Sequence, residues 1–575
     1  MKHLVRALLA ALCLGPLGVS FCAAAQPQDA TASADARWSG FVDRFLEAHF
    51  AANPTFAVAS GRHEYDGQLP DYSPAALQAE IARLQHARSE IAAFDGAQLG
   101  ESARFERDYL AAVIDEQLFW RAEAQWPQRN PAYYLDDLDP EPYLNKPYAP
   151  LAERMRAYIA YARAIPRVAA QIRANLRTPM PGPWIEYGAN AFNGFADFYA
   201  NDVAAIYAPV KDAGLQADLR AANTAAAAAM RELGGWLSSQ RATATSDFAI
   251  GAALYSRMLA ATEQVQLPLE RVAEIGRADL ARNTEALASA CRQLLPQGTV
   301  AECVARVRSH KAADGPVALA RRQLPELEAF VRQSNIVTIP SDDRALVASA
   351  PPYNAQNFAY IIVPGPYETN VPATYYIAPP DPRWTPEQRA QYVLPDASML
   401  FTSVHEVWPG HFLQFLHSNR SHSRVGQLFT GYAFAEGWAH YAEELMWDVG
   451  LHAGDPEAHV GQLLQALWRD VRYVSAIGLH TGTLTVADSE RLFREQAWLD
   501  AGNAHQQALR GAYDPGYLNY TLGKLMIRKL RDDWAATRGG RAAWREFHDR
   551  LLALGGPPLP LARRALLGTE AGDVL

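Results

Sequence analysis

The interval between apolar residues is the feature that most limits how this chain can fold. From residue 36 to about residue 331, apolar side chains recur mostly at the three- and four-residue spacing of a buried helix face. The spacing is clearest in four segments, at 101–124, 152–176, 215–242 and 269–295. We therefore predict a helical scaffold over residues 26–332.

The sequence pattern changes between residues 333 and 380. Short runs of β-branched and aromatic residues alternate there with proline and glycine, at 336–339, 360–363 and 373–377. The helical spacing returns from residue 386, with breaks at 450–456 and 514–516. We expect a mainly α fold that encloses a small antiparallel β-sheet, and a single unit over residues 26–575 whose last part, 381–575, is again helical.

The N-terminus has the three parts of a secretory signal peptide. Residues 1–6 are basic, residues 7–21 are apolar, and small residues at 23–25 precede Gln26. The apolar part is shorter than the roughly 20 residues of a membrane-spanning helix. We predict that residues 1–25 are removed, leaving a periplasmic or secreted protein without an integral membrane segment. Cys22 raises the alternative of lipid attachment, but the bulky Phe21 fits a lipoprotein cleavage site poorly.

Two cysteines, Cys291 and Cys303, remain after this cleavage. They flank a turn-like stretch at 295–298 between two helical segments, so in an oxidising compartment they could form a disulfide across a helical hairpin. Two buried thiols are the alternative.

The charge of the chain limits its partners. The formal net charge is −9, and basic residues are not clustered, which argues against a nucleic-acid partner. The sequence does not indicate an oligomeric state.

The strongest chemical signal is the segment from His405 to His411, which reads His-Glu-Val-Trp-Pro-Gly-His. It is close to the HExxH motif, in which two histidines four residues apart bind zinc and the glutamate activates a water molecule. Here the histidines are six residues apart, which on a regular helix turns them about 120° away from a common face. Pro409 and Gly410 could supply a bulge that brings His411 back beside His405. The alternative is that Pro409 and Gly410 simply end a helix and that both histidines are ordinary surface or core residues.

A zinc site in a hydrolase needs a third protein ligand and an open position for water. Glu436 offers that ligand, and Glu443 follows seven residues later on nearly the same helix face. One carboxylate could bind the metal while the other holds a ligand imidazole. A solvated surface charge is the alternative for Glu443, and His440 and Glu444 are weaker ligand candidates.

Three blocks of the chain, at 405–414, 436–443 and 520–523, together resemble the bacterial domain of unknown function 885 family, which looks related to gluzincin metallopeptidases. A fainter match at 53–61 extends this resemblance over nearly the whole mature chain. At Ala476 the chain departs from it, because family members often carry an aspartate there. A partner that this acid would orient is therefore missing or replaced.

The resemblance implies a zincin-like helical metallopeptidase fold with one Zn²⁺ per chain. His405, His411 and Glu436 would hold the metal, and Glu406 would be the general base. Tyr520 would stand near the reacting carbonyl and donate to the developing oxyanion, with a packed core tyrosine as the alternative.

Further residues are expected around this centre. We place Glu443, Gln414 and His480 beside the metal ligands. The small Gly523, three residues after Tyr520, could leave room for substrate beside the phenol.

The sequence thus favours a secreted zinc-dependent hydrolase that cleaves peptide bonds, chiefly of short peptides. We expect the strand at 373–377 to bind the substrate backbone by strand addition, with Tyr375 and Tyr376 in contact with substrate. The alternatives are a zinc-dependent amidase or esterase acting on a small metabolite, and a non-catalytic periplasmic binding or scaffold protein. An intact Glu406 argues against the last, since a purely structural zinc site needs no general base.

Overall fold

The computed structural model describes residues 27–351, 354, 358–380, 384–568 and 573–575. The signal peptide predicted for residues 1–25, including Cys22, lies outside these ranges. Within the ranges, no helix combines the length and the apolar character needed to cross a membrane.

The first part of the described chain is helical, as the apolar spacing predicts. Its helices are α1 (Pro27–Ala52), α2 (Pro54–Ala59), α3 (Pro74–Ala93), α4 (Glu101–Leu118), α5 (Trp126–Arg129), α6 (Glu141–Leu144), α7 (Leu151–Asn175), α8 (Gly182–Asn201), α9 (Val203–Ile206), α10 (Ala213–Ser239), α11 (Ala252–Thr262), α12 (Leu269–Leu294), α13 (Val300–Ser309) and α14 (Pro316–Ser334). The four segments with the clearest spacing correspond to α4, α7, α10 and α12.

Helices return after the sheet. They are α15 (Pro386–Tyr392), α16 (Asp396–Glu406), α17 (His411–Ser418), α18 (Arg424–Leu428), α19 (Tyr432–Asp448), α20 (Pro456–Thr481), α21 (Val486–Glu495), α22 (Ala501–Tyr513), α23 (Asn519–Ala536), α24 (Trp544–Ala553) and α25 (Leu559–Leu567). The two predicted breaks fall between α19 and α20 and between α22 and α23.

The sheet has three strands, β1 (Leu346–Ser349), β2 (Ala359–Ile362) and β3 (Thr374–Ile377), in the order β1-β3-β2. β2 pairs with β3 antiparallel, but β1 pairs with β3 parallel. The prediction of an antiparallel sheet is therefore wrong, and the sheet is mixed. Alternation of side chains along a strand shows which residues share a face, but it does not show the direction of the neighbouring strand.

The predicted strand at 336–339 is also wrong. These residues follow α14 as an irregular segment whose backbone is bonded to helices instead of to strands. The Thr338 amide donates to Asp549 of α24 over 2.7 Å, and the Ile336 carbonyl lies 2.7 Å from Nδ1 of His548. Because these side chains satisfy the backbone, an apolar β-branched run needs no strand partner here.

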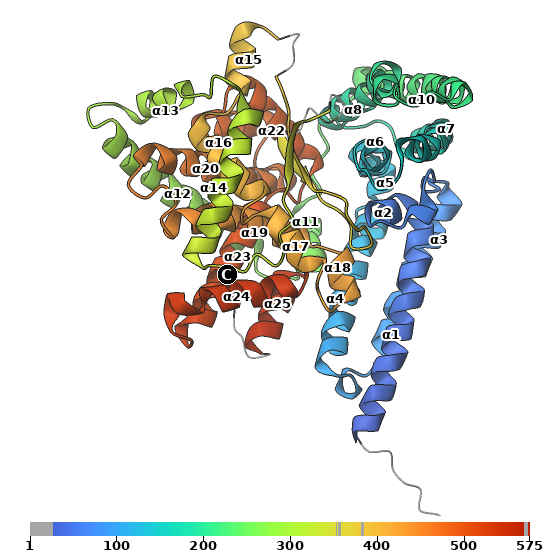
Figure 1. Ribbon diagram of the computed structural model, residues 1–575, viewed down its shortest axis with the longest axis horizontal. Coiled ribbons are helices and arrows are strands. Elements are labelled where there is room, and N and C mark those ends of the chain that lie inside the picture. Colours follow the sequence, from blue (N-terminus) through green and yellow to red (C-terminus); the bar gives the residue numbers. More distant parts are fainter. Residues whose placement is uncertain (1–26, 352–353, 355–357, 381–383, 569–572) are drawn as a thin grey trace, which may run out of the picture.

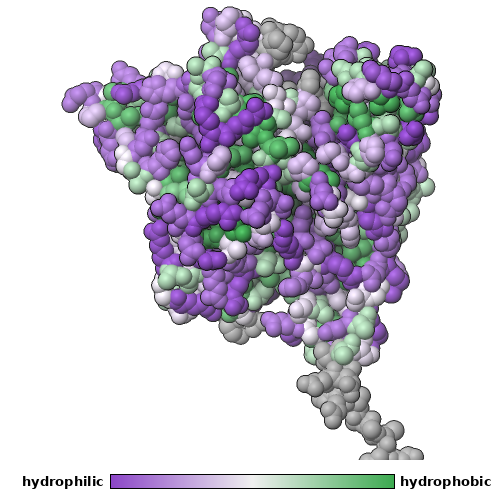
Figure 2. All heavy atoms as spheres, viewed as in Figure 1, coloured by the Kyte–Doolittle hydropathy of each residue, from purple (hydrophilic) through white to green (hydrophobic). Residues whose placement is uncertain are grey.

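The sheet stands between two groups of helices (Figure 1). α1 to α8 and α10 gather on one side, and α12, α14 and most helices of the C-terminal part gather on the other. One large hydrophobic core runs through both groups, from Val58 to Ala562, and a smaller cluster joins α1, α3 and α4. Hydrophilic residues cover most of the face seen in Figure 2, with smaller hydrophobic areas between them.

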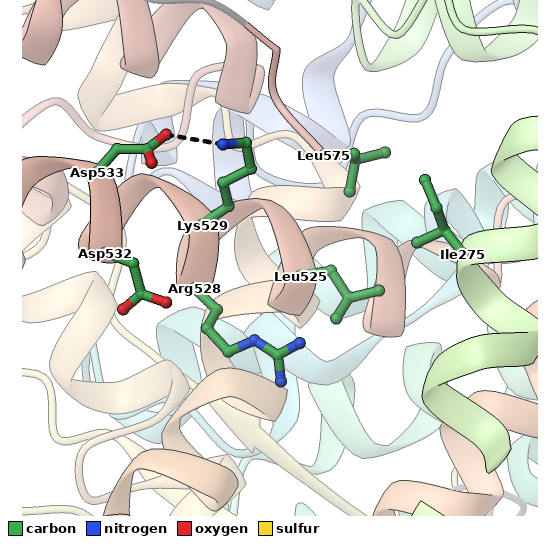
Figure 3. Close-up of a pocket in the computed structure, with 7 residues that line it drawn as sticks. All are labelled: Ile275, Leu525, Arg528, Lys529, Asp532, Asp533 and Leu575. Atoms are coloured by element: carbon green, nitrogen blue, oxygen red, sulfur yellow. Dashed lines mark hydrogen bonds and ion pairs between the residues drawn. The ribbon is translucent and has the colours of Figure 1, made fainter. Parts of the chain in front are cut away.

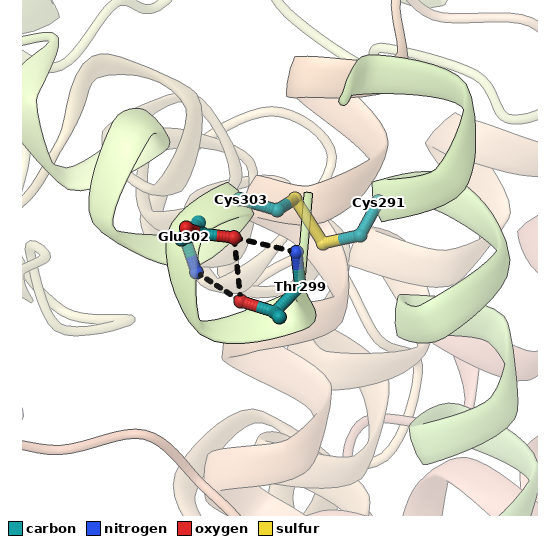
Figure 4. The surroundings of a disulfide bond; sticks show 4 residues. All are labelled: Cys291, Thr299, Glu302 and Cys303. Carbon is teal, nitrogen blue, oxygen red and sulfur yellow. Dashed lines mark hydrogen bonds between the residues drawn. A yellow bond between two sulfur atoms is a disulfide. The ribbon is translucent and has the colours of Figure 1, made fainter. Parts of the chain in front are cut away.

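Of the two alternatives for the cysteines, the structure contains the disulfide. Cys291 at the end of α12 is bonded to Cys303 in α13 (Figure 4). The turn between these helices ends in a capping box, in which the Glu302 amide donates to the Thr299 hydroxyl and the Thr299 amide donates to the Glu302 carboxylate. Bond and cap together tie this hairpin at its tip.

α19 and α23 cross at very close range because both carry glycine at the contact. A Cβ atom placed on Gly523 would lie 1.8 Å from the Ala433 carbonyl oxygen, and one placed on Gly437 would lie 2.5 Å from the Gly523 Cα. Gly523 therefore leaves room for a helix backbone and not, as the sequence suggested, for substrate. This crossing brings the start of α23 beside the first half of α19.

Replacing Gly523 by alanine should destabilise the protein. The added methyl group cannot move away from backbone atoms, so we expect Gly523→Ala to lower the free energy of unfolding by about 1–3 kcal/mol, measured by chemical denaturation. Gly235→Ala is the matched control, since Gly235 is an exposed position inside α10 with no atom within 4 Å of an added Cβ. The control should raise stability by about 0.4–1 kcal/mol. Equal effects of the two substitutions would contradict a tight crossing.

Candidate metal centre

The two histidines of the sequence motif lie on separate helices. α16 ends at Glu406 and α17 begins at His411, with a four-residue loop between them. The amide of Gly410 donates to the carbonyl of Val404 over 3.0 Å, six residues back, where a regular helix would bond four residues back. The chain therefore contains two more residues here than a regular helix would. As a result, His411, six residues after His405, occupies the position that a residue four after His405 has on a regular helix.

Gly410 is required for this geometry. A Cβ atom on Gly410 would lie 1.8 Å from the His405 carbonyl oxygen. The sequence prediction that Pro409 and Gly410 return His411 to His405 therefore gives the correct result, but the device is a loop between two helices and not a bulge within one.

His405, His411 and Glu436 converge on one point. Their ligand atoms all lie within 4.8 Å of one another. Oε2 of Glu436 lies 3.2 Å from Nε2 of His405 and 3.4 Å from Nε2 of His411, and the two imidazole rings are perpendicular. Among the described residues, this is the cluster of histidine, cysteine and acidic side chains that could hold a metal ion.

The two distances from Glu436 suit zinc. In a tetrahedral site with metal–ligand distances of about 2.1 Å, neighbouring ligand atoms lie roughly 3.4 Å apart. Both Glu436 distances match that spacing. Two imidazole nitrogens and one carboxylate are also the donor set of a catalytic zinc site, which keeps its fourth position open.

Glu443 orients the first histidine. It is fully buried on α19, and its Oε1 lies 2.7 Å from Nδ1 of His405, so the alternative of a solvated surface charge does not hold. Although burial opposes ionisation, the nearby charges of Arg469 and His440 and the hydrogen bond to His405 hold the pKa of Glu443 well below its usual range. A carboxylate that accepts from Nδ1 directs Nε2 toward Glu436 and the metal position.

The carboxylates around His405 create a place for positive charge. Burial alone would lower the pKa of His405, but hydrogen bonds to Glu436 and Glu443 outweigh it and raise that pKa to about 9. In the absence of a metal, a proton would supply the charge. A divalent cation bound by Nε2 would replace the proton beside Glu436, while the protonated Nδ1 goes on donating to Glu443.

Glu406 lies beside the ligands with its carboxyl group almost fully buried. Burial raises the pKa of Glu406, and the neighbouring His405 and His411 oppose that rise. The buried Tyr375 lies within electrostatic range, since the charge of Glu406 adds to burial in raising the pKa of its phenol. Glu406 is thus a desolvated carboxylate next to the candidate metal ligands.

Tyr520 reaches the same centre from α23. Its ring stacks on the His405 imidazole, with centroids 6.2 Å apart and an interplanar angle of 18°. The close crossing of α19 and α23 explains how a residue more than a hundred positions away in sequence arrives there. Tyr520 is 6% exposed, so the tyrosine is both packed and adjacent to a candidate ligand.

Two other residues considered for this centre, His480 and Glu444, contact other groups. His480 stacks with Tyr255, and its Nε2 lies 2.8 Å from the carbonyl of Gly511 in α22, so it ties α20 to α22 and does not contact the ligands. Gln414 is buried, and its amide atoms have no hydrogen-bond partner among the described residues. Glu444 pairs with Arg528 instead of facing the metal position.

The predicted role of the strand at 373–377 is wrong. This segment is β3, the central strand, and both of its edges are already bonded, to β1 and to β2. A peptide can add only to a free edge. Tyr375 is fully buried, and Tyr376 is 7% exposed and stacks on Tyr360, so neither is placed to receive an added strand.

Two cavities lie near these elements without containing the metal cluster. One, of about 740 Å³, lies between β1 and α14 and reaches Trp408 in the loop between the histidine helices. The other, of about 400 Å³, lies beside α23, where Leu575 faces Ile275 (Figure 3).

Sequence reasoning missed the arginines of this centre. Arg469 of α20 lies 3.6 Å from Glu443, and the guanidinium groups of Arg472 and Arg510 lie over the Tyr520 ring. No sequence signal pointed to them, because the polar residues of 458–480 recur at three- and four-residue spacing, the pattern of a solvated helix face.

Comparison with known proteins shows the family. A family model described as bacterial protein of unknown function (DUF885) matches residues 54–566, and the chain belongs to this family. No curated protein matches. A solved structure from Shewanella oneidensis, described as a lipoprotein of unknown function, is similar with 22% identity and a TM-score of 0.75, over 92% of this chain and 99% of that one.

A second similar structure is described as a lipoprotein from Colwellia psychrerythraea. It has 19% identity and a TM-score of 0.79, over 93% of this chain and 98% of that one. At these identities the likeness establishes a shared fold.

Removing one ligand should remove the metal. We expect the purified mature protein to carry about one zinc per chain by elemental analysis, and His411→Ala to lose most of it, since two remaining ligands hold zinc weakly. His422→Ala is the matched control, an exposed histidine in the same region outside the cluster. Zinc retained in full by His411→Ala, or lost equally from the control, would remove His411 as a ligand.

Proposed function

We propose that this protein is a secreted, zincin-like, zinc-dependent hydrolase that cleaves peptide bonds, with short peptides as substrates. The observation that carries the proposal is the convergence of His405, His411 and Glu436 within 4.8 Å, next to a buried Glu406. Three ligands with a free fourth position, beside a desolvated carboxylate, are what metal-assisted hydrolysis needs.

A zinc ion held by His405, His411 and Glu436 would supply Lewis acidity toward the scissile carbonyl and toward water. Glu406 accepts a proton from the attacking water, whose oxygen adds to the carbonyl carbon. Glu406 then returns that proton to the amide nitrogen as the carbon–nitrogen bond breaks. The products are a carboxylic acid and an amine, and Glu406 ends as it began.

Tyr520 would assist the same step. Its ring lies against the His405 imidazole, and the charge of Glu436 adds to burial in raising the pKa of its phenol, which supports a hydroxyl near the metal position. A phenol donates a hydrogen bond most strongly when the carbonyl oxygen gains negative charge, and this stabilises the transition state more than the substrate.

The proposed location is outside the cytoplasm. The signal-peptide pattern of residues 1–25 supports it, and so do the descriptions of both similar structures as lipoproteins. A cysteine pair joined as a disulfide agrees with an oxidising compartment.

Glu406→Gln separates metal binding from chemistry. Glutamine keeps the shape of the side chain but cannot accept the proton, so kcat on a peptide library should fall by about 10²–10⁴ while zinc content stays unchanged. Activity within about threefold of the unmodified protein would refute the general-base role.

Tyr520→Phe tests the oxyanion donor. If the hydroxyl acts mainly in the transition state, kcat and kcat/KM should fall together by about 10²–10³ while zinc content and melting temperature barely move. A core tyrosine would behave differently, because loss of a buried, bonded hydroxyl lowers stability by about 1 kcal/mol. A destabilised variant with normal kcat would remove Tyr520 from the catalytic group.

A further inference from the structure

Arg472 is a buried cation without a matching anion. It is 6% exposed on α20, and no carboxylate of the described residues lies within ion-pair distance of it. Its one side-chain hydrogen bond there runs from Nε to the Gln507 amide oxygen over 2.8 Å. The two terminal nitrogens of its guanidinium group, with their four N–H donors, make no hydrogen bond within the described part of the chain.

Neighbours along the helix do not supply the missing charge. The positions one turn away on α20 are Trp468, Arg469, Ser475 and Ala476. Other buried cations of this half are matched, since Lys524 lies 2.6 Å from Asp279 and Arg469 lies 3.6 Å from Glu443. An unpaired buried charge is costly, so Arg472 is an exception that a bound anion would resolve.

Aromatic rings hold this guanidinium group next to the candidate metal centre. Its central carbon lies 5.1 Å from the Trp468 ring centroid and 4.7 Å from that of Tyr520. Tyr520 in turn stacks on the metal-ligand candidate His405. Only the Tyr520 ring therefore separates Arg472 from His405, a candidate metal ligand. The two aromatic contacts hold the guanidinium group in one orientation before a substrate binds.

A second arginine adds to the positive charge. The Arg510 guanidinium carbon lies 5.8 Å from the Tyr520 ring centroid. Arg510 already donates to Asp514 and to the Tyr432 hydroxyl. It therefore adds positive electrostatic potential near Tyr520 but has fewer N–H donors left for a ligand. Of these two arginines, Arg472 is therefore the one whose charge has no carboxylate partner among the described residues.

We propose that Arg472 binds a carboxylate of the peptide substrate, foremost the C-terminal carboxylate, so that the protein acts as a carboxypeptidase that removes one or a few residues. This rests on the proposed hydrolase function. The Arg472 guanidinium carbon lies 4.7 Å from the Tyr520 ring centroid, which lies 6.2 Å from the His405 ring centroid. Because one extended residue spans about 3.3–3.6 Å, a peptide that reaches from Arg472 to His405 needs only a few residues. A guanidinium group offers two parallel N–H donors, which match the two oxygens of a carboxylate.

The direct test compares one peptide as its free acid and as its C-terminal amide. We expect the zinc-loaded protein to cleave the acid with a kcat/KM about 10- to 100-fold higher, the range of a charge-assisted hydrogen bond. Amide peptides with glutamate or glutamine near the C-terminus form the second arm. Preference for the glutamate amide would identify a side-chain carboxylate as the partner.

Substitutions then assign the preference to Arg472. Arg472→Met should bring the acid-to-amide ratio close to one, and Arg472→Lys should keep part of the preference because the charge remains. Arg129→Met is the matched control, a half-buried arginine that also lies over two tryptophan rings, Trp126 and Trp184, on α5 and α8. The control should leave the ratio unchanged.

A binding measurement separates the two proposals. In the Glu406→Gln background, calorimetry should show the acid peptide binding about 10- to 100-fold more tightly than the amide, and Arg472→Met should abolish the difference. Preferential binding without cleavage by the unmodified protein would keep the carboxylate site and refute the peptidase. Cleavage of acid and amide at equal rates, with equal binding, would refute the carboxylate site and keep the peptidase.

Discussion

The centre depends on the close crossing of α19 and α23, where two glycines let the helix backbones touch. α19 carries Glu436 and Glu443, and α23 carries Tyr520, so this single contact sets a candidate metal ligand, the carboxylate that orients His405 and the phenol relative to one another. Side chains of ordinary size would hold the helices 8–10 Å apart and would separate these groups.

Charge is distributed unevenly around that crossing. Hydrogen bonds to Glu436 and Glu443 outweigh burial and raise the pKa of His405, so positive charge is favoured on this side. Next to Tyr520, Arg472 lacks a carboxylate partner among the described residues. A substrate that presents its carbonyl to the metal and a carboxylate to Arg472 would complement both sides, which is why the proposed reaction and the proposed specificity use one surface.

Local sequence patterns predicted the main helices and the candidate metal ligands. They failed where a segment's structure depends on which distant segment it pairs with. Apolar spacing located α4, α7, α10 and α12, and the motif residues His405, His411 and Glu436 do converge. The run at 336–339 has strand composition, yet side chains of α24 satisfy its backbone. Strand composition at 373–377 suggested that Tyr375 and Tyr376 contact a substrate bound by strand addition, but their strand is central and bonded on both edges.

The sequence alone determined the helical class, because apolar spacing recurs over most of residues 36–331. It also determined the residue types available for a metal and the need for a break between His405 and His411, because these follow from residue identity and spacing along the chain. Only the tertiary structure decided which carboxylate orients His405, that Gly523 serves a helix crossing, and that Arg472 stands unpaired beside Tyr520. These facts depend on which distant segments are neighbours, and a sequence pattern carries no such distances.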